Sequence, residues 1–316
     1  MNIYRIWDKI KKQKVSMLIL PIVKIINFYK YYVLSEKQLL QKEFKRLLGY
    51  SLNLENPKTL NEKLQWLKLH QRKEVFTLCA DKIKVRNYIK EIIGEKYLIP
   101  MCFHTYNIDE LDNNKLPDYP VIIKTNHDSS GGLIIDNKDK VDWVSTRKHF
   151  KSLCKKSYYR RTKEWPYKNI KPGILVEKLL ITENGKIPND YKIHCFNGKV
   201  KMIQVDIDRN TDHRRNWYDK NWNSLPFHWN GSQFNGKENF ISQNDISKPH
   251  KLEKMIAISE KLANQFDYVR VDLYVFEDDL YFGELTFYHG SGYSPVFPFE
   301  YDKKLGDDLI LNHKIQ

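Results

Sequence analysis

Cysteine is scarce in this 316-residue chain, and the four that occur are widely separated. Cys79, Cys102, Cys154 and Cys195 form no CxxC pair and no cluster with histidine. A disulfide framework or a zinc site would require such groupings. We therefore expect neither, and the cysteines fit a reducing, cytoplasmic environment.

A long hydrophobic run is also missing. The most apolar N-terminal stretch, residues 15–34, is interrupted by Pro21, Lys24 and Lys30, which makes it a poor transmembrane span. It also lacks the small-residue cleavage site of a secretion signal. The sequence contains no internal repeat, no low-complexity tract and no GxxxxGK[ST] phosphate loop. No Ser/His/Asp or Cys/His arrangement of a nucleophilic enzyme stands out.

Acidic residues are outnumbered by basic ones, 39 to 53, so the formal net charge is +14. Residues 1–50 alone hold eleven Lys and Arg against three Asp and Glu. This excess predicts an anionic partner. A basic amphipathic segment on an anionic membrane surface is one interpretation, and a helix pair packed on the main body with its lysines in water is the other. Nucleic acid is not expected, because no recognisable binding motif accompanies the charge.

With 41% hydrophobic residues the chain is globular and long enough for two or three subdomains. Helices are predicted at 36–50, 59–70, 75–93, the start of 142–170, 249–266 and the C-terminus. Strands are predicted at 121–125, 133–135 and 173–180, with a hairpin at 190–208 whose turn is Asn197-Gly198. Residues 158–166 are expected to be irregular, and the Trp- and Asn-rich stretch 217–244 a long surface loop.

A second predicted hairpin, residues 270–286, carries the most informative charges. If its turn is centred on Asp278, Asp272 lies opposite Glu284, and Arg270 lies opposite Thr286 on the same face. Two facing carboxylates repel each other, so the pair calls for a cation such as Mg²⁺, which takes oxygen ligands. The alternative is a solvated face that Arg270 neutralises. A turn displaced by one residue would break this pairing.

Other candidate ligand contacts precede this hairpin. Lys124 ends a strand that leads into the Ser/Gly-rich loop 129–132, whose successive amide groups can cradle an anion. Lys82 and Arg86 are spaced to share one face of the predicted helix 75–93. A small polar turn and a solvated helix face are the respective alternatives.

Taken in order, these motifs resemble the ATP-grasp superfamily. More closely they are similar to its teichuronopeptide-biosynthesis-type branch, found in bacterial polysaccharide clusters. The resemblance covers roughly residues 55–305 and is most specific at 80–86, 190–198 and 270–286. It implies an α+β, ATP-grasp fold whose antiparallel sheets and flanking helices clamp a nucleotide between two subdomains. The corresponding divisions are a basic helical segment (1–54), a helical subdomain (55–118), a lid (119–173) and a C-terminal subdomain with the metal site (174–316).

The resemblance also implies roles for individual residues. ATP would be held by Lys82, Lys124, Ser129, Ser130, Gly131, Gly132, Glu177, Lys178, Leu180, Glu183 and Lys192, with Glu177 and the backbone of 178–180 at the adenine and Glu183 at the ribose. Mg²⁺ would be held by Asp272, Glu284 and Thr286, although many ATP-grasp enzymes have Asn at the position of Thr286. Substrate and catalytic contacts would come from Lys124, Arg209, Arg214, Arg270, His289, Gly290 and Gly292, with His289 either a base for the amine or a structural residue.

These roles predict an ATP-dependent carboxylate–amine ligase that acts through an acyl phosphate. The resemblance implies a uronic acid of a surface polysaccharide, or its lipid-linked precursor, as the acid and an amino acid or amine as its partner. Such an enzyme would be cytoplasmic, with the inner membrane face as an additional location. Two alternatives stay open: a metal-dependent glycosyltransferase that uses Asp206 and Asp208 as a DxD motif, and a non-catalytic adaptor for polyanions or membranes.

Overall fold

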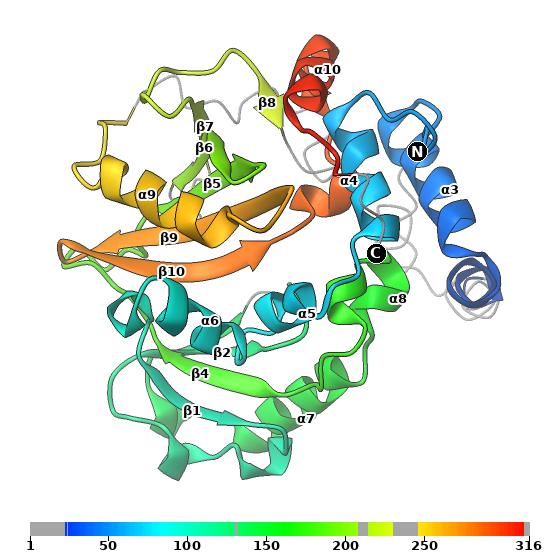
Figure 1. Cartoon of the computed structure of the whole chain (residues 1–316). Coiled ribbons are helices and arrows are strands. Elements are labelled where there is room, and N and C mark those ends of the chain that lie inside the picture. Colours follow the sequence, from blue (N-terminus) through cyan, green and yellow to red (C-terminus); the bar gives the residue numbers. More distant parts are fainter. Residues whose placement is uncertain (1–22, 24, 130–131, 208–213, 230–245, 313–316) are drawn as a thin grey trace.

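The computed structural model describes residues 23, 25–129, 132–207, 214–229 and 246–312. Two antiparallel sheets face each other, with helices between and around them (Figure 1). The small sheet has the order β1-β4-β2-β3, from Met101–Thr105, Ile174–Lys178, Val121–Thr125 and Gly132–Ile135. The large sheet has the order β10-β9-β5-β6-β7, from Asp279–Thr286, Tyr268–Phe276, Asp190–Phe196, Lys199–Ile207 and Arg214–Tyr218. The predicted α+β architecture is therefore confirmed.

Helices connect and cover the sheets. In chain order they are η1 (Tyr29–Val33), α3 (Glu36–Leu48), α4 (Leu60–His70), α5 (Glu74–Ala80), α6 (Val85–Ile92), η2 (Glu95–Tyr97), η3 (Ile108–Glu110), η4 (Asn113–Lys115), η5 (Lys138–Lys140), α7 (Trp143–Cys154), α8 (Tyr158–Thr162), η6 (Trp165–Tyr167), α9 (Leu252–Ala263), η8 (His289–Gly292) and α10 (Phe299–Asp308). The capping box predicted for Thr59 and Glu62 is present at the start of α4. None of the helices in the described ranges combines the length and apolar character that crossing a bilayer requires.

Alternation along the strands separates an apolar face of the large sheet from a polar one. Ile193 on β5, and Val271 and Leu273 on β9, belong to the main hydrophobic core. Their even-numbered neighbours, including Lys192 and Asp272, point to the opposite face. Phe76 of α5 packs against Phe287 and Phe266 in the same core. β5 and β9 thus each contribute one face to the core and direct Lys192 and Asp272 to the other.

The hairpin of β9 and β10 has a different turn from the predicted one but the predicted pairing. Glu277 and Asp278 form a two-residue turn, both with positive φ, so strand residues next to it pair as Asp279 with Phe276. A bulge at Gly283 then shifts the register, and beyond it Glu284 faces Asp272 and Thr286 faces Arg270. The pairing is confirmed, and the bulge compensates for the shorter turn.

The predicted helix 75–93 is wrong as a single element. The chain breaks between α5 and α6, and the carboxylate of Asp81 accepts hydrogen bonds from the amides of Ile83 and Lys84 at the break. Such side-chain bonds compete with the helical backbone pattern. Lys82 therefore sits in a turn and not on a helix face shared with Arg86.

Two predicted irregular stretches contain regular structure. Residues 158–162 form α8. Within 217–244, Trp217 and Tyr218 are buried in β7, and Trp229 is buried in the short strand β8 (His228–Trp229), which pairs with β11 (Val296–Phe297). Large aromatic side chains gain more from burial than from a surface loop. Residues 230–244 of that stretch lie outside the described ranges.

The strand pairing groups the chain differently from the expected subdomains. β1 pairs with β4, and β4 pairs with β2. The expected boundaries at 118/119 and 173/174 thus assign neighbouring strands of one sheet to three different units. The two sheets are linked where Leu98 forms a bridge to Phe282 of β10.

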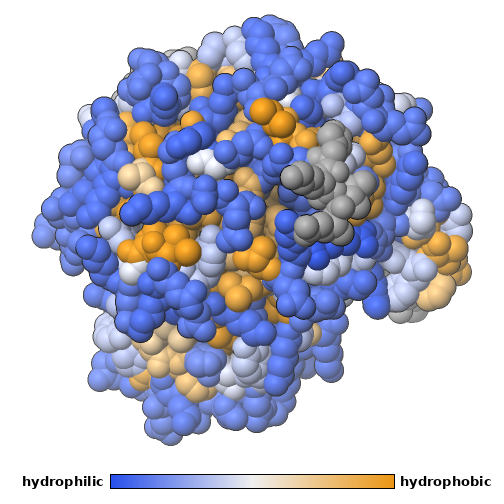
Figure 2. All heavy atoms as spheres, viewed as in Figure 1, coloured by the Kyte–Doolittle hydropathy of each residue, from blue (hydrophilic) through white to orange (hydrophobic). Residues whose placement is uncertain are grey.

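The N-terminal region is helical where it is described. Ser35 and Gln38 form a capping box for α3, and Leu40 and Phe44 are buried against the body. Ahead of α3, by contrast, Ile25, Ile26 and Phe28 are exposed. Figure 2 shows apolar side chains gathered where this segment protrudes from an otherwise mainly hydrophilic surface. Residues 1–22, with much of the predicted basic segment, lie outside the described ranges.

Candidate nucleotide-binding site

Glu177 of β4 joins two basic side chains on the small sheet. Its Oε2 lies 2.9 Å from Lys124 Nζ on β2, and its Oε1 lies 3.0 Å from Arg86 Nη1 on α6. The antiparallel register places Glu177 opposite Ile122, two residues from Lys124 and on its face. Glu177 is buried, so its bond to Lys124 fixes the lysine side chain near the end of β2.

Lys82 faces this pair from the break between α5 and α6. Its amide donates to the carbonyl of Asn126 at 3.1 Å, and its Nζ donates to the carbonyl of Asp128. Burial lowers the Lys82 pKa, and the nearby carboxylate of Glu284 is the strongest opposing influence. The helix break therefore places Lys82 near enough to the large sheet for Glu284 to affect its pKa.

On the large sheet, Arg270 holds both facing carboxylates. Its Nε and Nη2 donate to Asp272 at 2.6 and 2.7 Å, and Nη2 also donates to Glu284 at 2.9 Å. Thr286 Oγ1 donates to the same Glu284 oxygen at 2.9 Å. The four predicted residues thus form one hydrogen-bonded group, as the strand register requires.

Lys192 extends this group into β5. The register places Lys192 directly opposite Asp272, and its buried Nζ lies 3.0 Å from the Asp272 carboxylate. Lys192 also pairs with Asp190, and it lies 3.8 Å from Asp206. A role for Asp190 could not be predicted, because nothing in the sequence indicates that β9 lies beside β5.

Asp206, one half of the DxD motif, is an internal ion-pair partner. It is 2% exposed and accepts bonds from Arg215 Nε at 2.7 Å and Nη2 at 3.3 Å. Arg215 therefore neutralises the carboxylate that the glycosyltransferase alternative needs for a metal. Asp208 lies outside the described ranges.

The facing carboxylates have the donor chemistry that Mg²⁺ prefers. Burial raises the pKa of Asp272, although Arg270 and Lys192 oppose this. Burial also acts to raise the Glu284 pKa, but Arg270, Lys82 and Lys192 outweigh it and lower the value to about 2. In the described ranges no group of three or more His, Cys, Asp or Glu is arranged for a metal. The donor set is thus two carboxylates and the Thr286 hydroxyl, all oxygen, which fits Mg²⁺.

His289 is packed behind Arg270. Arg270 Nη1 donates to His289 Nδ1 at 2.9 Å, and the ring lies against Trp229, with centroids 4.3 Å apart. Burial, His194 and Arg270 hold the pKa of His289 well below its ordinary value. A neutral imidazole whose acceptor nitrogen is occupied orients the guanidinium, so this geometry favours the structural alternative over a base.

The glycine turn after β10 is held by α4. Gln65 Nε2 donates to the carbonyls of Ser291 and Gly292 at 3.1 and 2.6 Å. A Cβ added to Gly292 would lie 2.6 Å from the same Gln65 nitrogen, and φ there is +63°. Gly290 is exposed at the same turn.

The remaining predicted residues are spread around this centre. Ser129 donates to the Tyr158 hydroxyl at 2.8 Å, and Gly132 begins β3 opposite Lys124. The amides of Lys178 and Leu179 already donate to the carbonyls of Pro100 and Pro120. Further residues are placed as follows: Leu180 packs with Ile99 and Phe276, Glu183 is exposed in a turn, Arg214 lies on β7, and Ser130, Gly131 and Arg209 lie outside the described ranges.

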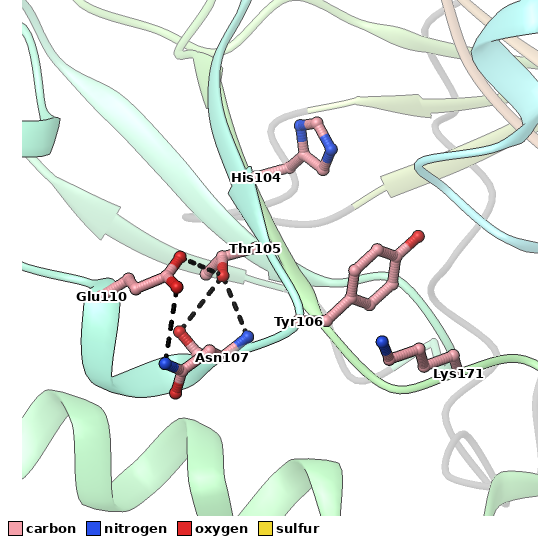
Figure 3. Close-up of a pocket in the computed structure, with 6 residues that line it drawn as sticks. All are labelled: His104, Thr105, Tyr106, Asn107, Glu110 and Lys171. Atoms are coloured by element: carbon pink, nitrogen blue, oxygen red, sulfur yellow. Dashed lines mark hydrogen bonds between the residues drawn. The ribbon is translucent and has the colours of Figure 1, made fainter.

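Two surface cavities lie beside the small sheet. One of about 400 Å³ is lined by His104, Tyr106 and Lys171, with Thr105, Asn107 and Glu110 hydrogen-bonded beside them (Figure 3). Another, of about 670 Å³, includes Arg86 and Pro100. The second adjoins Glu177 through Arg86 and the end of β4 through Pro100, where the adenine is expected.

Two opposed antiparallel sheets, with Lys82 near Glu284, agree with the ATP-grasp class that the sequence suggests. The profile of the TupA-like ATP-grasp family matches residues 62–310. The chain therefore belongs to the TupA-like ATP-grasp family, and the resemblance found in the sequence is confirmed. ATP-grasp proteins use ATP and Mg²⁺, which favours the ATP-grasp interpretation over the glycosyltransferase and the adaptor.

Similar solved structures are more distant. They include D-alanine–D-alanine ligase from Bacillus anthracis (15% identity, 66% of this chain and 57% of that chain, TM-score 0.39) and the ATP-grasp ligase PsnB with minimal precursor, Mg and ADP (12%, 79% and 65%, 0.41). A RiPP-associated ATP-grasp ligase from Chryseobacterium gregarium is another (15%, 89% and 69%, 0.38). The chain spans less than two thirds of the length of the first two of these proteins. Curated protein sequences gave no significant match. The assignment rests on the family profile.

Proposed function

We propose that this protein is an ATP-dependent carboxylate–amine ligase that activates its acid substrate as an acyl phosphate. The observation that carries the proposal is the facing pair of Asp272 and Glu284 on β9 and β10, both bonded to Arg270. Lys82 of the other half lies near enough to Glu284 for each charge to shift the pKa of the other. A lysine of one half beside carboxylates of the other suits a magnesium–phosphate group.

In this proposal each half binds a different part of the nucleotide. Lys82 and Lys124 contact phosphate oxygens, together with the amides of loop 129–132. Asp272, Glu284 and Thr286 would hold Mg²⁺, which supplies neutralisation of phosphate charge when bound. Lys192 neutralises the carboxylates from behind, and Arg270, oriented by His289, stabilises charge at the transferred phosphoryl group. No protein nucleophile is needed for such a step.

The adenine and ribose are assigned to the end of β4. Glu177 and the segment 178–180 are proposed to contact the adenine. Glu183 is proposed to contact the ribose. Because the amides of Lys178 and Leu179 are already bonded, the carbonyl groups and the Leu180 side chain are left for this contact. Lys124 would exchange its bond to Glu177 for a bond to phosphate.

The substrates are proposed from charge and from the family. A uronic acid of a bacterial surface glycan, free or lipid-linked, would supply the carboxylate. Arg209 and Arg214 would bind it, since guanidinium groups match carboxylates, with Gly290 and Gly292 close to the reacting group. An amino acid or another amine would be the acceptor. The exposed apolar segment at 25–28, beside a basic N-terminus, supports a peripheral location on the inner membrane face.

Two measurements test this proposal. MgATP should raise the melting temperature, by the equivalent of about 2.7 kcal/mol at a hundred times Kd, whereas a nucleotide sugar should not. ADP release should then depend on both partners when ATP, Mg²⁺, uronic acids and amino acids are combined in a panel. Lys124→Ala and Asp272→Ala should both abolish release, and Lys156→Ala, which removes an exposed lysine, should not. Stabilisation by the nucleotide sugar alone would contradict the ligase.

A further inference from the structure

A buried acid and a buried amine lie on either side of Ser291, outside the roles assigned so far. Lys68 of α4 is 0% exposed, and its Nζ donates to Ser291 O at 2.6 Å, Ser291 Oγ at 3.0 Å and Thr162 O at 3.2 Å. Glu164 is 3% exposed, and the Ser291 side chain lies near enough to lower the Glu164 pKa. The Ser291 hydroxyl therefore lies between the Lys68 amine and the Glu164 carboxylate, and we call the three residues the Lys68–Ser291–Glu164 series.

Two features of the Lys68–Ser291–Glu164 series lower the stability of the fold, so a purely structural role does not explain them. The Glu164 Oε1 atom has no hydrogen-bond partner among the described residues, and a buried acceptor left unpaired costs about 1–3 kcal/mol. Ser291 has φ of +56° without being glycine, a conformation that concentrates at functional sites. An acceptor oxygen without a partner, beside a residue with a strained backbone, indicates a binding site for a hydrogen-bond donor.

The Lys68–Ser291–Glu164 series borders the candidate phosphate site. Glu164 lies on the segment 158–167, which we call the strap, and the strap contacts the loop 129–132 through Tyr158 and Ser129. Glu284 contributes to the raised pKa of Glu164. Tyr167, at the end of the strap, is influenced by both Glu284 and Arg270. Glu164 and the proposed metal-binding carboxylates thus share one low-dielectric interior.

We propose that Glu164, connected through Ser291 to Lys68, binds the incoming amine and accepts its proton. This assignment rests on the proposed ligase function and identifies the acceptor side of that site. As the amine nitrogen bonds to the acyl carbon, the carbon–oxygen bond to phosphate breaks and phosphate leaves with the electron pair. The proton released from nitrogen moves to Glu164 Oε1. Glu164 then gives a proton to the Ser291 oxygen as the Ser291 hydroxyl gives its own proton to neutral Lys68, so that Glu164 returns to a carboxylate.

The surroundings allow Lys68 to be neutral near physiological pH. Burial lowers the Lys68 pKa to about 7, opposed by Glu164. Burial raises the Glu164 pKa, opposed by Lys68, Ser291 and Arg161 and assisted by Glu284. Four tyrosines surround the pair, and the charge of Glu164 raises the pKa of each: Tyr158, Tyr167, Tyr288 and Tyr293. Above pH 7 the lysine can therefore receive the proton.

Hydroxylamine separates this role from a structural one, because it is already a free base at neutral pH and captures acyl phosphates as hydroxamates. The uronic acid and amino acid most active in the ADP-release panel serve as the other probes. Glu164→Gln should lower the rate with the amino acid about 100-fold and leave hydroxamate formation within about threefold of wild type. Ser291→Gly, which removes the hydroxyl and suits the positive φ, should give the same split. Glu74→Gln, at an exposed site, is the matched control.

The pH profile gives the second readout. The wild-type rate with the amino acid should rise through about pH 7, and Lys68→Arg should lose this rise because arginine does not release its proton. Equal losses with the amino acid and with hydroxylamine in both Glu164→Gln and Ser291→Gly would overturn the relay and leave the ligase intact. If the wild-type protein forms neither ADP nor hydroxamate with any acid, the ligase function itself fails.

Discussion

At the scale of single residues, the site is an arrangement of charges that balance one another. Asp190, Asp206 and Asp272 surround Lys192, and Asp272 and Glu284 share Arg270. Buried charges persist only when they are paired in this way. Each member therefore affects both folding and ligand binding, and its ionisation sets the pH range in which the site is intact.

Glu284→Gln tests this balance. The Glu284 pKa is lowered from 4.5 to about 2 in the folded protein, so its contribution to stability is fully present above pH 4.5 and is lost as pH falls towards 2. The variant should be less stable by about 1.5 kcal/mol at pH 7, a low value because the side chain is 33% exposed. Urea unfolding between pH 3 and 7 should show the difference shrinking at the acid end. Glu253→Gln, an exposed change, should show no such trend, and a constant difference for Glu284→Gln would contradict the assignment.

At the scale of elements, a bulge and a helix break align the site. The Gly283 bulge sets which residues of β10 face β9, and the break after α5 turns Lys82 away from a helix face. Asn126 ties the break to the segment before β4: its side chain bonds Asp81, the carbonyl of Lys171 and the amide of Gly173. Irregular backbone at these points re-aims side chains that regular elements would direct elsewhere.

Gly283→Ala should disturb the alignment of β10. A Cβ there would lie 2.9 Å from the Tyr274 ring and 3.2 Å from the Asp272 carbonyl. We expect a loss of about 1–3 kcal/mol from overpacking and a smaller thermal shift with MgATP than in wild type. Asp279→Ala, at an exposed position of the same strand, is the control. An unchanged MgATP shift in a destabilised Gly283→Ala protein would show that the bulge does not position the metal ligands.

At the scale of the whole molecule, the N-terminal region combines a packed helix with an exposed apolar segment. Leu40 and Phe44 anchor α3 in a cluster that includes Leu69 of α4. Ile25 and Phe28, 68% and 59% exposed, precede it. The packed-helix interpretation of the basic N-terminus therefore describes α3, and the membrane interpretation stays a prediction for the segment before it.

Deleting residues 1–33 removes the exposed apolar segment and leaves α3 in place. The capping residue Ser35 and the buried face of α3 are kept, so the melting temperature should change little. Sedimentation with phosphatidylglycerol vesicles should fall at least tenfold relative to the full chain, because basic residues near an anionic surface contribute about 1 kcal/mol each. Phosphatidylcholine vesicles are the control. Undiminished binding of the deleted protein would refute a membrane role for the segment.

Much of the fold could be predicted from local pattern, because alternation, capping and turn residues act over short distances. The hairpins at 190–208 and 270–286, the capping box of α4 and the Asp272–Glu284 pairing follow from such signals. The break at Asp81 and the strand at Trp229 could not be predicted this way. One depends on a side chain competing with helical hydrogen bonds, and the other on a partner strand more than 60 residues away.

The sequence alone determined the types of charged residue, their order and the strand faces they occupy, since these depend on neighbours in the chain. Tertiary structure alone decided that β5 lies beside β9, so that Lys192 meets Asp272. It also placed Lys82 near Glu284 and Lys68 beside Ser291. Long-range packing makes these contacts, because the buried faces of distant elements must fit together before their polar faces can meet.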